Sequence, residues 1–333
     1  MPEYQEKNSA IVFVTDPGFL VPSISAATQV ANQHKVTSIA DIYIILVDFE
    51  ESVVDLIRSV FTPFGIKFLT IAPASFLPSD PIALNKTHVP MTTLGRLAIQ
   101  EVIPSSIEHV LYIDGDVQIL GDIFPLVSHR VKPGHIAAAN ESLWLCQNDL
   151  GSFWPRHKKY LDHLGIENPI DYFNAGVLAF RMDTWREMAP KALSYFTKNS
   201  AECLYHDQSA LNAVFLGRRE ILSPTYNFNS FFSTLGTIAE TKPKIAHFTG
   251  GYKPWFFPGP PWHGKFIGQY EELATKYDVL KPFSKKMPPE QIRRIIASER
   301  KSRFKQFIIT PWRSWLRRRE FLRYLQETEF SVT

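Results

Sequence analysis

The sequence is poor in several features that would assign a protein to a class directly. Its 333 residues include only two cysteines, Cys146 and Cys203, without CxxC spacing. This pattern indicates neither a zinc cluster nor a disulfide framework. Two unpaired cysteines fit a reducing compartment. No apolar run approaches the roughly 20 residues that span a bilayer. The first ten residues, MPEYQEKNSA, have neither a basic segment nor an apolar core, so we expect no secretory signal and a soluble body.

Positive charge is also scarce in most of the chain and is concentrated at one end. Residues 281–333 carry 14 Lys and Arg against 5 Asp and Glu, whereas residues 1–280 carry 22 against 28. An acidic body with a basic tail indicates a polyanionic partner for the tail, either anionic lipid or nucleic acid. We therefore divide the chain into a body, 1–280, and a C-terminal extension, 281–333.

What is abundant is apolar sequence, at 45% of residues, arranged as short strands that alternate with helical segments. Strands are predicted at 10–16, 41–48, 66–71 and 109–113, and helices at 23–32, 50–61 and 92–103. This alternation is typical of a parallel or mostly parallel sheet covered on both faces. Further along we expect a loop-like stretch to about residue 168, a strand at 172–181 whose start is broken at 174–176, helices near 184–198 and 206–216, and a structured loop at 241–265.

Two carboxylates follow the predicted strand 109–113, at Asp114 and Asp116, and Asp16 follows the first strand. Ligands of parallel sheets bind beyond the carboxyl ends of the strands, so these acids are expected to face one crevice. A pair of carboxylates one residue apart can hold Mg²⁺ or Mn²⁺, with open positions for phosphates. Gly115 lets the backbone approach the ligand. Alone, such a triplet is more often a solvated turn.

A second polar motif is KIAHFTGGYKPW, residues 244–255. His247 can supply a nitrogen ligand, which favours Mn²⁺ over Mg²⁺. Gly250 and Gly251 can wrap a phosphate with backbone N–H groups, and Lys253 can neutralise its charge. The alternative is a histidine that is hydrogen-bonded beside an aromatic cluster.

Two further sites carry polar residues in apolar surroundings. Asn174 and Gly176 lie within an otherwise apolar strand, where the alternative is a β-bulge. Asp207 and Gln208 lie at the start of a predicted helix, where the alternative for Asp207 is a helix cap.

Taken together and in order, five motifs resemble family 8 glycosyltransferases, which include bacterial lipopolysaccharide α-galactosyl- and α-glucosyltransferases. The resemblance covers residues 10 to about 256, and its motifs are HVPMTTLGRLAIQEVIP, HVLYIDGDVQILGDI, DYFNAGVLAFRMDTWRE, HDQSALNAVF and KIAHFTGGYKPW. It implies a GT-A fold, a Rossmann-like, mostly parallel twisted sheet flanked by helices. It also implies a UDP-sugar donor, Mn²⁺ (or Mg²⁺) and retention of anomeric configuration.

The resemblance assigns roles to individual residues. It implies metal ligands at Asp114, Asp116 and His247, and catalytic roles for Gln208, which faces the anomeric centre, and Asp207. It implies donor contacts at Val14, Asp16, His88, Arg96, Asp114, Gly115, Asn174, Ala175, Gly176, Gly250 and Lys253. Asn140 stands where galactosyltransferases of the family have a sugar-binding Asp, and Gly18 and Phe19 replace a polar residue and Tyr.

These assignments imply transfer of glucose or galactose from a UDP-hexose to a saccharide or glycolipid acceptor such as lipopolysaccharide. The C-terminal segment 290–326 mixes arginines with aromatic residues, and Pro311 is expected to split it into two helices. Such a tail suits an anionic membrane surface, here the cytoplasmic face of an inner membrane; the alternative is a helix pair packed on the body. We expect no nucleic-acid partner. Two other functions are the alternatives: a metal-dependent phosphohydrolase, and a nucleic-acid-binding protein that acts through the tail.

Overall fold

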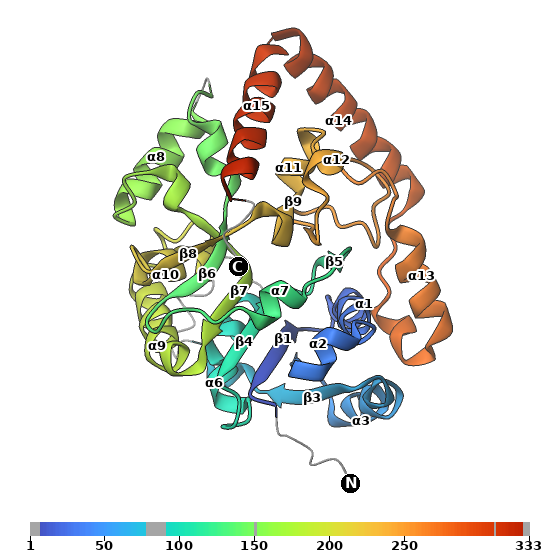
Figure 1. Ribbon diagram of the computed structural model, residues 1–333. Coiled ribbons are helices and arrows are strands. Elements are labelled where there is room, and N and C mark those ends of the chain that lie inside the picture. Colours follow the sequence, from blue (N-terminus) through green and yellow to red (C-terminus); the bar gives the residue numbers. More distant parts are fainter. Residues whose placement is uncertain (1–6, 78–90, 150–151, 310, 329–333) are drawn as a thin grey trace.

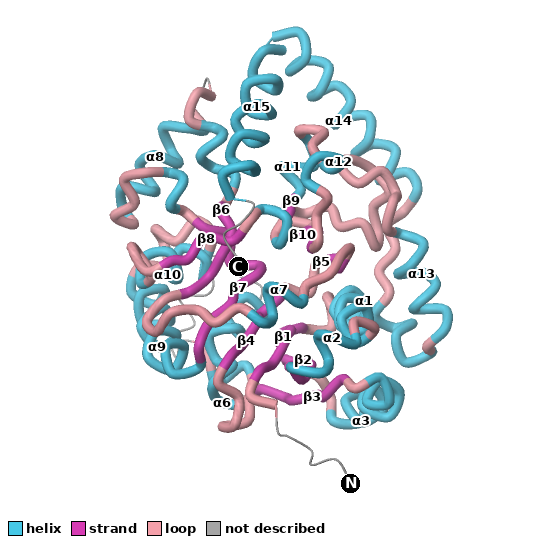
Figure 2. The backbone as a smooth tube through the Cα atoms, viewed as in Figure 1, coloured by secondary structure: helices cyan, strands magenta, loops and turns pink. Residues whose placement is uncertain are grey.

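A seven-stranded, mostly parallel sheet lies at the centre of the computed structural model (Figures 1 and 2), which describes residues 7–77, 91–149, 152–309 and 311–328. The strand order is β3-β2-β1-β4-β7-β6-β8; β7 is antiparallel to both neighbours, and the other pairs are parallel. The strands are β1 (Ser9–Thr15), β2 (Ala40–Val47), β3 (Ile66–Ile71), β4 (His109–Ile113), β6 (Ile136–Asn140), β7 (Phe173–Arg181) and β8 (Arg219–Leu222).

Helices cover both faces of this sheet, because the inner strands are apolar on both sides. In β1, Ile11 and Phe13 enter one hydrophobic cluster, and Val12 and Val14 enter another on the opposite face. The first face is covered by α1 (Leu20–Ala31), α2 (His34–Ile39), α3 (Glu51–Phe61), α7 (Phe124–Ser128) and α13 (Ile267–Lys276). The second is covered by α5 (Met91–Gly95), α6 (Ile99–Val102), α9 (Met182–Lys198) and α10 (His206–Val214).

A second, three-stranded sheet brings distant segments beside the end of β4. It consists of β5 (Val117–Ile119), β10 (Ile245–His247) and β9 (Phe228–Asn229), in the order β5-β10-β9. In its register Val117 faces His247, and His247 faces Asn229. Because β5 begins one residue after Asp116, this pairing places the end of β10 next to the turn that follows β4.

The basic C-terminal segment forms two helices, α14 (Pro289–Ile309) and α15 (Pro311–Thr328), as the position of Pro311 predicted (Figure 1). One face of α15 packs on the body: Phe321 and Tyr324 belong to the larger hydrophobic cluster, and the ring of Phe321 stacks on Phe232 with centroids 4.4 Å apart. The opposite face leaves Trp312 and Trp315 55% and 58% exposed. Among the described residues, no helix combines the length and apolarity needed to cross a bilayer.

The predicted strands and most of the predicted helices are found, with four differences. The predicted loop before residue 168 contains α8 (Phe153–His163), and the predicted loop 241–265 contains β10. The predicted helix 92–103 is interrupted by a 3₁₀ turn at Arg96–Ala98. Residues 174–176 lie within a continuous β7, and the irregularity is in β6, between Ala138 and Asn140. The other short helices of the described chain are α11 (Ser230–Thr234) and α12 (Ile238–Thr241). The other 3₁₀ turns lie at Thr62–Phe64, Pro73–Ser75, Ser142–Cys146, Pro169–Asp171, Pro224–Tyr226 and Asp278–Phe283.

Candidate active site

The turn Asp114-Gly115-Asp116 lies at the carboxyl end of β4, where the sequence predicted the ligand-binding edge of the sheet. Gly115 is required there for a reason other than the predicted approach of a ligand. A Cβ on Gly115 would lie 2.2 Å from Oγ of Ser23 in α1, so the missing side chain lets the turn pack against a helix. That close packing sets the position from which both carboxylates project.

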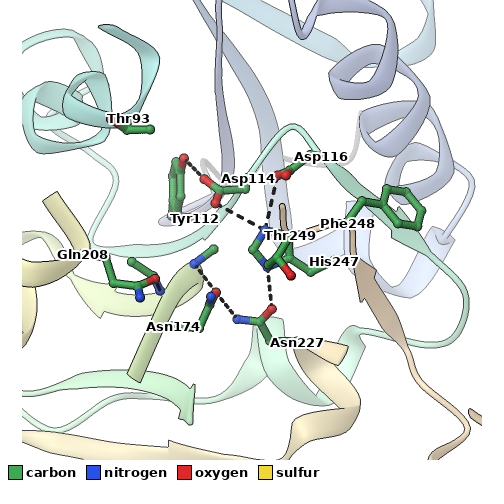
Figure 3. A network of polar contacts seen from close by, with 12 residues as sticks. Thr93, Tyr112, Asp114, Asp116, Asn174, Gln208, Asn227, His247, Phe248 and Thr249 are labelled. Carbon is green, nitrogen blue, oxygen red and sulfur yellow. Dashed lines mark hydrogen bonds and ion pairs between the residues drawn. The ribbon is translucent and has the colours of Figure 1, made fainter. Parts of the chain in front are cut away.

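His247 reaches the two aspartates from the second sheet (Figure 3). Its Nε2 lies 3.3 Å from Oδ1 of Asp116 and 3.7 Å from Oδ2 of Asp114. One ligand atom from each of the three residues lies within 4.8 Å of the others. The structure therefore brings together the three residues that the sequence proposed as metal ligands, from segments more than 130 positions apart.

Gly176 leaves the space that the imidazole of His247 occupies. A Cβ at this position would lie 2.2 Å from Cε1 of His247 and 2.9 Å from Oδ2 of Asp114. The strand β7 thus approaches the three-residue cluster so closely that no side chain fits between them.

Lys253 adds a positive charge to the Asp116 side of the cluster. Its Nζ lies 2.6 Å from Oδ2 of Asp116 and donates to the carbonyl oxygen of Phe248, also at 2.6 Å. Burial opposes ionisation of Asp116, but Lys253 and His247 outweigh it and hold the pKa of Asp116 well below its usual range. Burial likewise opposes protonation of His247, and the two aspartates nevertheless raise its pKa.

Arg96 forms ion pairs with two carboxylates, those of Asp114 and Asp207. The guanidinium is buried, with Nη2 3.0 Å from Oδ1 of Asp114 and Nε 2.8 Å from Oδ2 of Asp207. Its Nη1 donates to the carbonyl oxygen of Ala175. Asp207 lies in the first turn of α10, whose N-cap residue is Tyr205. Burial, supported by the charge of Asp114 and opposed by Arg96, raises the pKa of Asp207 to about 6.

Gln208, the next residue, is oriented by two hydrogen bonds. Its Oε1 accepts from the backbone N–H of Ala175 at 3.0 Å, and its Nε2 donates to the hydroxyl of Tyr172 at 3.1 Å. Tyr172 is fully buried. The amide is therefore held at the cleft wall by a strand on one side and a buried phenol on the other.

These residues line two adjoining cavities. The larger has a volume of about 500 Å³ and the smaller about 200 Å³. Five residues line both: Thr93, Arg96, Asp114, Asp116 and Lys253. Of the residues predicted from the sequence, the larger cavity is lined by Arg96, Asp114, Asp116, Asn174, Ala175, Asp207, Gln208, His247, Gly250 and Lys253. The smaller is lined, besides the shared residues, by Val14 and Gly115, and also by Phe19 and Tyr112.

Among the predicted donor contacts that the structure describes, Asp16 and Gly176 line neither cavity. Oδ1 of Asp16 accepts from the backbone N–H groups of Gly18 and Phe19, so this carboxylate shapes the turn after β1. His88 lies outside the described residues.

The structure places Asn140 and its neighbour Glu141 differently. The amide of Asn140 bonds to the carbonyl of Ile170 and to the hydroxyl of Tyr324, away from the cavities. Glu141 lines the larger cavity instead, and its Oε2 accepts from Nδ2 of Asn174 at 2.6 Å. Sequence reasoning also missed Asn227, whose Oδ1 bonds Nδ1 of His247 at 2.8 Å; no local pattern marks it, because the contact depends on the pairing of β9 with β10.

The sequence matches the family model described as "Glycosyl transferase family 8" over residues 10–258. The chain belongs to this family. "General stress protein A" of Bacillus subtilis is 26% identical over 204 aligned residues, in a match that covers 55% of this chain and 67% of that protein. "Glycosyltransferase 8 domain-containing protein 2" of Bos taurus is 27% identical over 179 residues, and the match spans 45% of this chain and 50% of that protein, so this chain covers about half of that relative's length.

The fold agrees with that of a solved glycosyltransferase structure. The galactosyltransferase LgtC, in complex with donor and acceptor sugar analogues, superposes with a TM-score of 0.62 at 20% identity, covering 85% of this chain and 99% of that one. The mostly parallel central sheet flanked by helices is thus the GT-A fold that the resemblance implied.

The donor set of the three-residue cluster fits a divalent metal ion. Two carboxylate oxygens and one imidazole nitrogen suit Mn²⁺, and the oxygens alone suit Mg²⁺. The hydrogen bond between Nδ1 of His247 and Asn227 leaves Nε2 directed at the aspartates, which is the second contact expected of a metal-binding histidine. We therefore treat Asp114, Asp116 and His247 as able to hold one cation.

Proposed function

We propose that the protein is a retaining glycosyltransferase that moves glucose or galactose from a UDP-hexose to a saccharide acceptor, with Mn²⁺ as cofactor. The observation that carries the proposal is the meeting of Asp114, Asp116 and His247 within 4.8 Å, in the same cavity as Lys253 and Gln208. A metal site, a lysine ammonium group and an oriented amide are suited to a nucleotide-sugar whose bond between C1 and the diphosphate is breaking.

In the proposed reaction the acceptor oxygen forms a bond to C1 of the sugar while the bond from C1 to the diphosphate oxygen breaks. The proton of the acceptor hydroxyl passes to the departing phosphate, so both partners react on the same face. Gln208 orients the sugar at C1, and Lys253 offsets the negative charge that grows on the diphosphate. The metal, when bound, lowers the same charge as a Lewis acid.

The remaining wall residues are proposed to bind the donor. Asn174, Ala175 and Gly176 contact ribose and sugar, Arg96 and Asp207 hold the sugar side, and Gly250 lies against the diphosphate. Val14 and Gly115 contact the nucleotide, whereas Asp16 acts through the turn that it shapes after β1; the donor contact of His88 stays a prediction from the sequence. Glu141, which lines the cavity, takes the sugar-binding role first given to the position of Asn140.

The test is release of UDP from a panel of UDP-sugars, with and without saccharide acceptors, before and after removal of divalent ions by a chelator. We expect Mn²⁺ to restore the activity, and we expect Asp116→Asn to lower it on the order of a thousandfold, about 4 kcal/mol in the barrier. Asp278→Asn, a change of an exposed carboxylate paired with Lys281, is the matched control. Full transfer after chelation contradicts the proposal, as does turnover of p-nitrophenyl phosphate in place of sugar transfer.

We further propose that the acceptor is a glycolipid such as lipopolysaccharide, and that residues 281–333 attach the protein to an anionic membrane, at the cytoplasmic face of an inner membrane. The exposed face of α15 supports this. It carries a groove of about 360 Å³ lined by Trp315, Arg318, Arg319, Leu322, Arg323 and Gln326, and Trp312 is exposed beside it. Aromatic rings with arginines are suited to the interface of anionic lipids.

Flotation with anionic phosphatidylglycerol vesicles tests the attachment. The double change Trp312→Ser and Trp315→Ser should abolish co-flotation, whereas Leu56→Ser in α3, at a comparably exposed leucine, should leave it intact. Equal co-flotation of all three proteins would refute attachment through α15. Retention on oligonucleotides but not on vesicles would favour a nucleic-acid partner instead.

A further inference from the structure

A chain of buried hydrogen bonds runs behind the metal-ligand cluster, from Glu141 to His247 (Figure 3 shows all but Glu141). Nδ2 of Asn174 donates to Oε2 of Glu141 at 2.6 Å, and Nδ2 of Asn227 donates to Oδ1 of Asn174 at 2.8 Å. Oδ1 of Asn227 then bonds Nδ1 of His247 at 2.8 Å. Asn174, Asn227 and His247 are 4%, 1% and 4% exposed, so water does not compete for these groups.

The donor and acceptor directions in this series of hydrogen bonds are fixed at its Glu141 end. Oε1 of Glu141 accepts from Nδ2 of Asn229 at 3.2 Å, and from N and Oγ of Ser142 at 2.7 and 2.9 Å. Surrounded by donors, the carboxylate acts only as an acceptor. Asn174 must therefore turn its NH₂ group towards Glu141 and its carbonyl oxygen towards Asn227.

The backbone of β7 fixes the same direction independently. The N–H of Gly176 donates to Oδ1 of Asn174 at 2.9 Å, and a backbone N–H can only donate. With the oxygen of Asn174 set by two donors, Asn227 must donate to it through Nδ2. The oxygen of Asn227 is then left for His247, whose Nδ1 must carry a proton to bond it.

We propose that Asn227 is a positioning residue for the divalent cation, and that Glu141, through Asn174, selects the His247 tautomer with its proton on Nδ1. This tautomer presents the Nε2 lone pair between Asp114 and Asp116. The other tautomer has a proton on Nε2, donates it to the aspartates and offers no lone pair to a metal. The inference rests on the proposed function, since the cation is the one that glycosyl transfer would use.

Nuclear magnetic resonance of ¹⁵N-labelled histidine in the metal-free protein at alkaline pH tests the tautomer directly. We expect the wild-type spectrum of His247 to show the proton on Nδ1, and Asn227→Ala to move population to Nε2. Titration with Mn²⁺ alone, followed by electron paramagnetic resonance, should then show affinity lowered about 10- to 100-fold in Asn227→Ala, the usual effect of removing an outer partner of a metal ligand.

Two further variants separate positioning from a merely structural role. Asn227→Asp keeps an acceptor for Nδ1 but sets a carboxylate against Oδ1 of Asn174, so it should lower the melting temperature and yet keep the Nδ1 proton. Glu141→Gln is nearly isosteric and does not touch His247. Its amide must keep its oxygen towards Asn229 and Ser142, so its NH₂ meets Nδ2 of Asn174 and disturbs the chain; Mn²⁺ affinity should fall in the same direction as in Asn227→Ala.

The outcomes are distinguishable. If the wild type binds Mn²⁺ and transfers sugar, but Asn227→Ala and Glu141→Gln bind Mn²⁺ equally well with Nδ1 still protonated, the inference fails and the proposed function stands. The inference is also overturned if the Mn²⁺ affinity of the variants falls in proportion to their melting temperature, because the effect would then be one of general stability. If the wild type does not bind Mn²⁺, the proposed function fails, and the inference fails with it.

Discussion

At the scale of single residues, the orientation of Gln208 depends on one buried hydroxyl. Tyr172→Phe removes the acceptor of Nε2 and also the bond of 2.9 Å to Tyr160, so the amide can rotate. We expect kcat to fall about tenfold, corresponding to roughly 1.4 kcal/mol, with little change in KM for the donor, because the cation and phosphate contacts remain. Steady-state kinetics on a UDP-sugar measures both.

Tyr226→Phe is the matched control for this change. Tyr226 is also buried, and its hydroxyl accepts from Lys244 at 3.2 Å, away from Gln208. An equal loss of kcat in the two variants would show that the effect is one of general stability and not of Gln208.

Gly176 gives a second prediction at this scale. Gly176→Ala places a methyl group 2.2 Å from the present position of Cε1 of His247, so the imidazole or β7 must move. We expect Mn²⁺ binding to be lost and the melting temperature to fall. Gly268→Ala in α13 meets no atom within 4 Å and should leave Mn²⁺ binding unchanged; retention of binding in Gly176→Ala would mean that His247 has room that the structure does not show.

At the scale of elements, what could be predicted from the sequence followed from local pattern. The buried strands β1, β2, β3 and β4 are short apolar runs bounded by turns, and the alternation with helices was sufficient to identify the sheet. The edge strand β8 is half exposed and only four residues long, and α8 buries only His157, Tyr160 and Leu161. The strand β8 is too short and α8 too polar to be recognised from the sequence.

The same limit applies to the site. Asp114 and Asp116 could be predicted because they follow a buried strand directly, and His247 because a motif surrounds it. Glu141 and Asn227 could not, since their partners lie 33 and 20 positions away and meet only when β7 and the second sheet assemble. The different placement of Asn140 and Glu141 could not be predicted either, because the sequence gives no register at the end of β6, where the pairing with β7 shifts.

The helix α15 provides a prediction at the scale of elements. Phe321→Ala removes a fully buried ring that stacks on Phe232, and the resulting cavity should lower the free energy of unfolding by about 3–5 kcal/mol. Trp315→Ala, at an exposed position, should change it by about 0.5 kcal/mol or less. Urea unfolding compares the two, and a small effect of Phe321→Ala would show that α15 is not part of the body in solution.

At the scale of the whole molecule, the two sheets meet at the cation site. Asp114 and Asp116 follow β4 of the main sheet, and His247 ends β10 of the second. A ligand bound across this boundary should therefore stabilise the whole fold. Mn²⁺ with UDP at a hundred times the dissociation constant should add about 2.7 kcal/mol to the free energy of unfolding, measured by thermal unfolding, and a chelator should remove the gain. The Asp116→Asn protein should show no gain.

The packing of α15 also bears on how the protein meets a surface. The helix contributes Phe321 and Tyr324 to the core, and Arg317 bonds Asp149 and the carbonyl of Leu145 and lies 5.6 Å from the ring of Phe231, which lines the larger cavity. The helix α15 is therefore packed firmly on the body and is not a flexible linker. Any lipid layer that receives Trp312 and Trp315 fixes the tilt of the entire enzyme, and with it the height at which the mouth of the cavity stands above the layer.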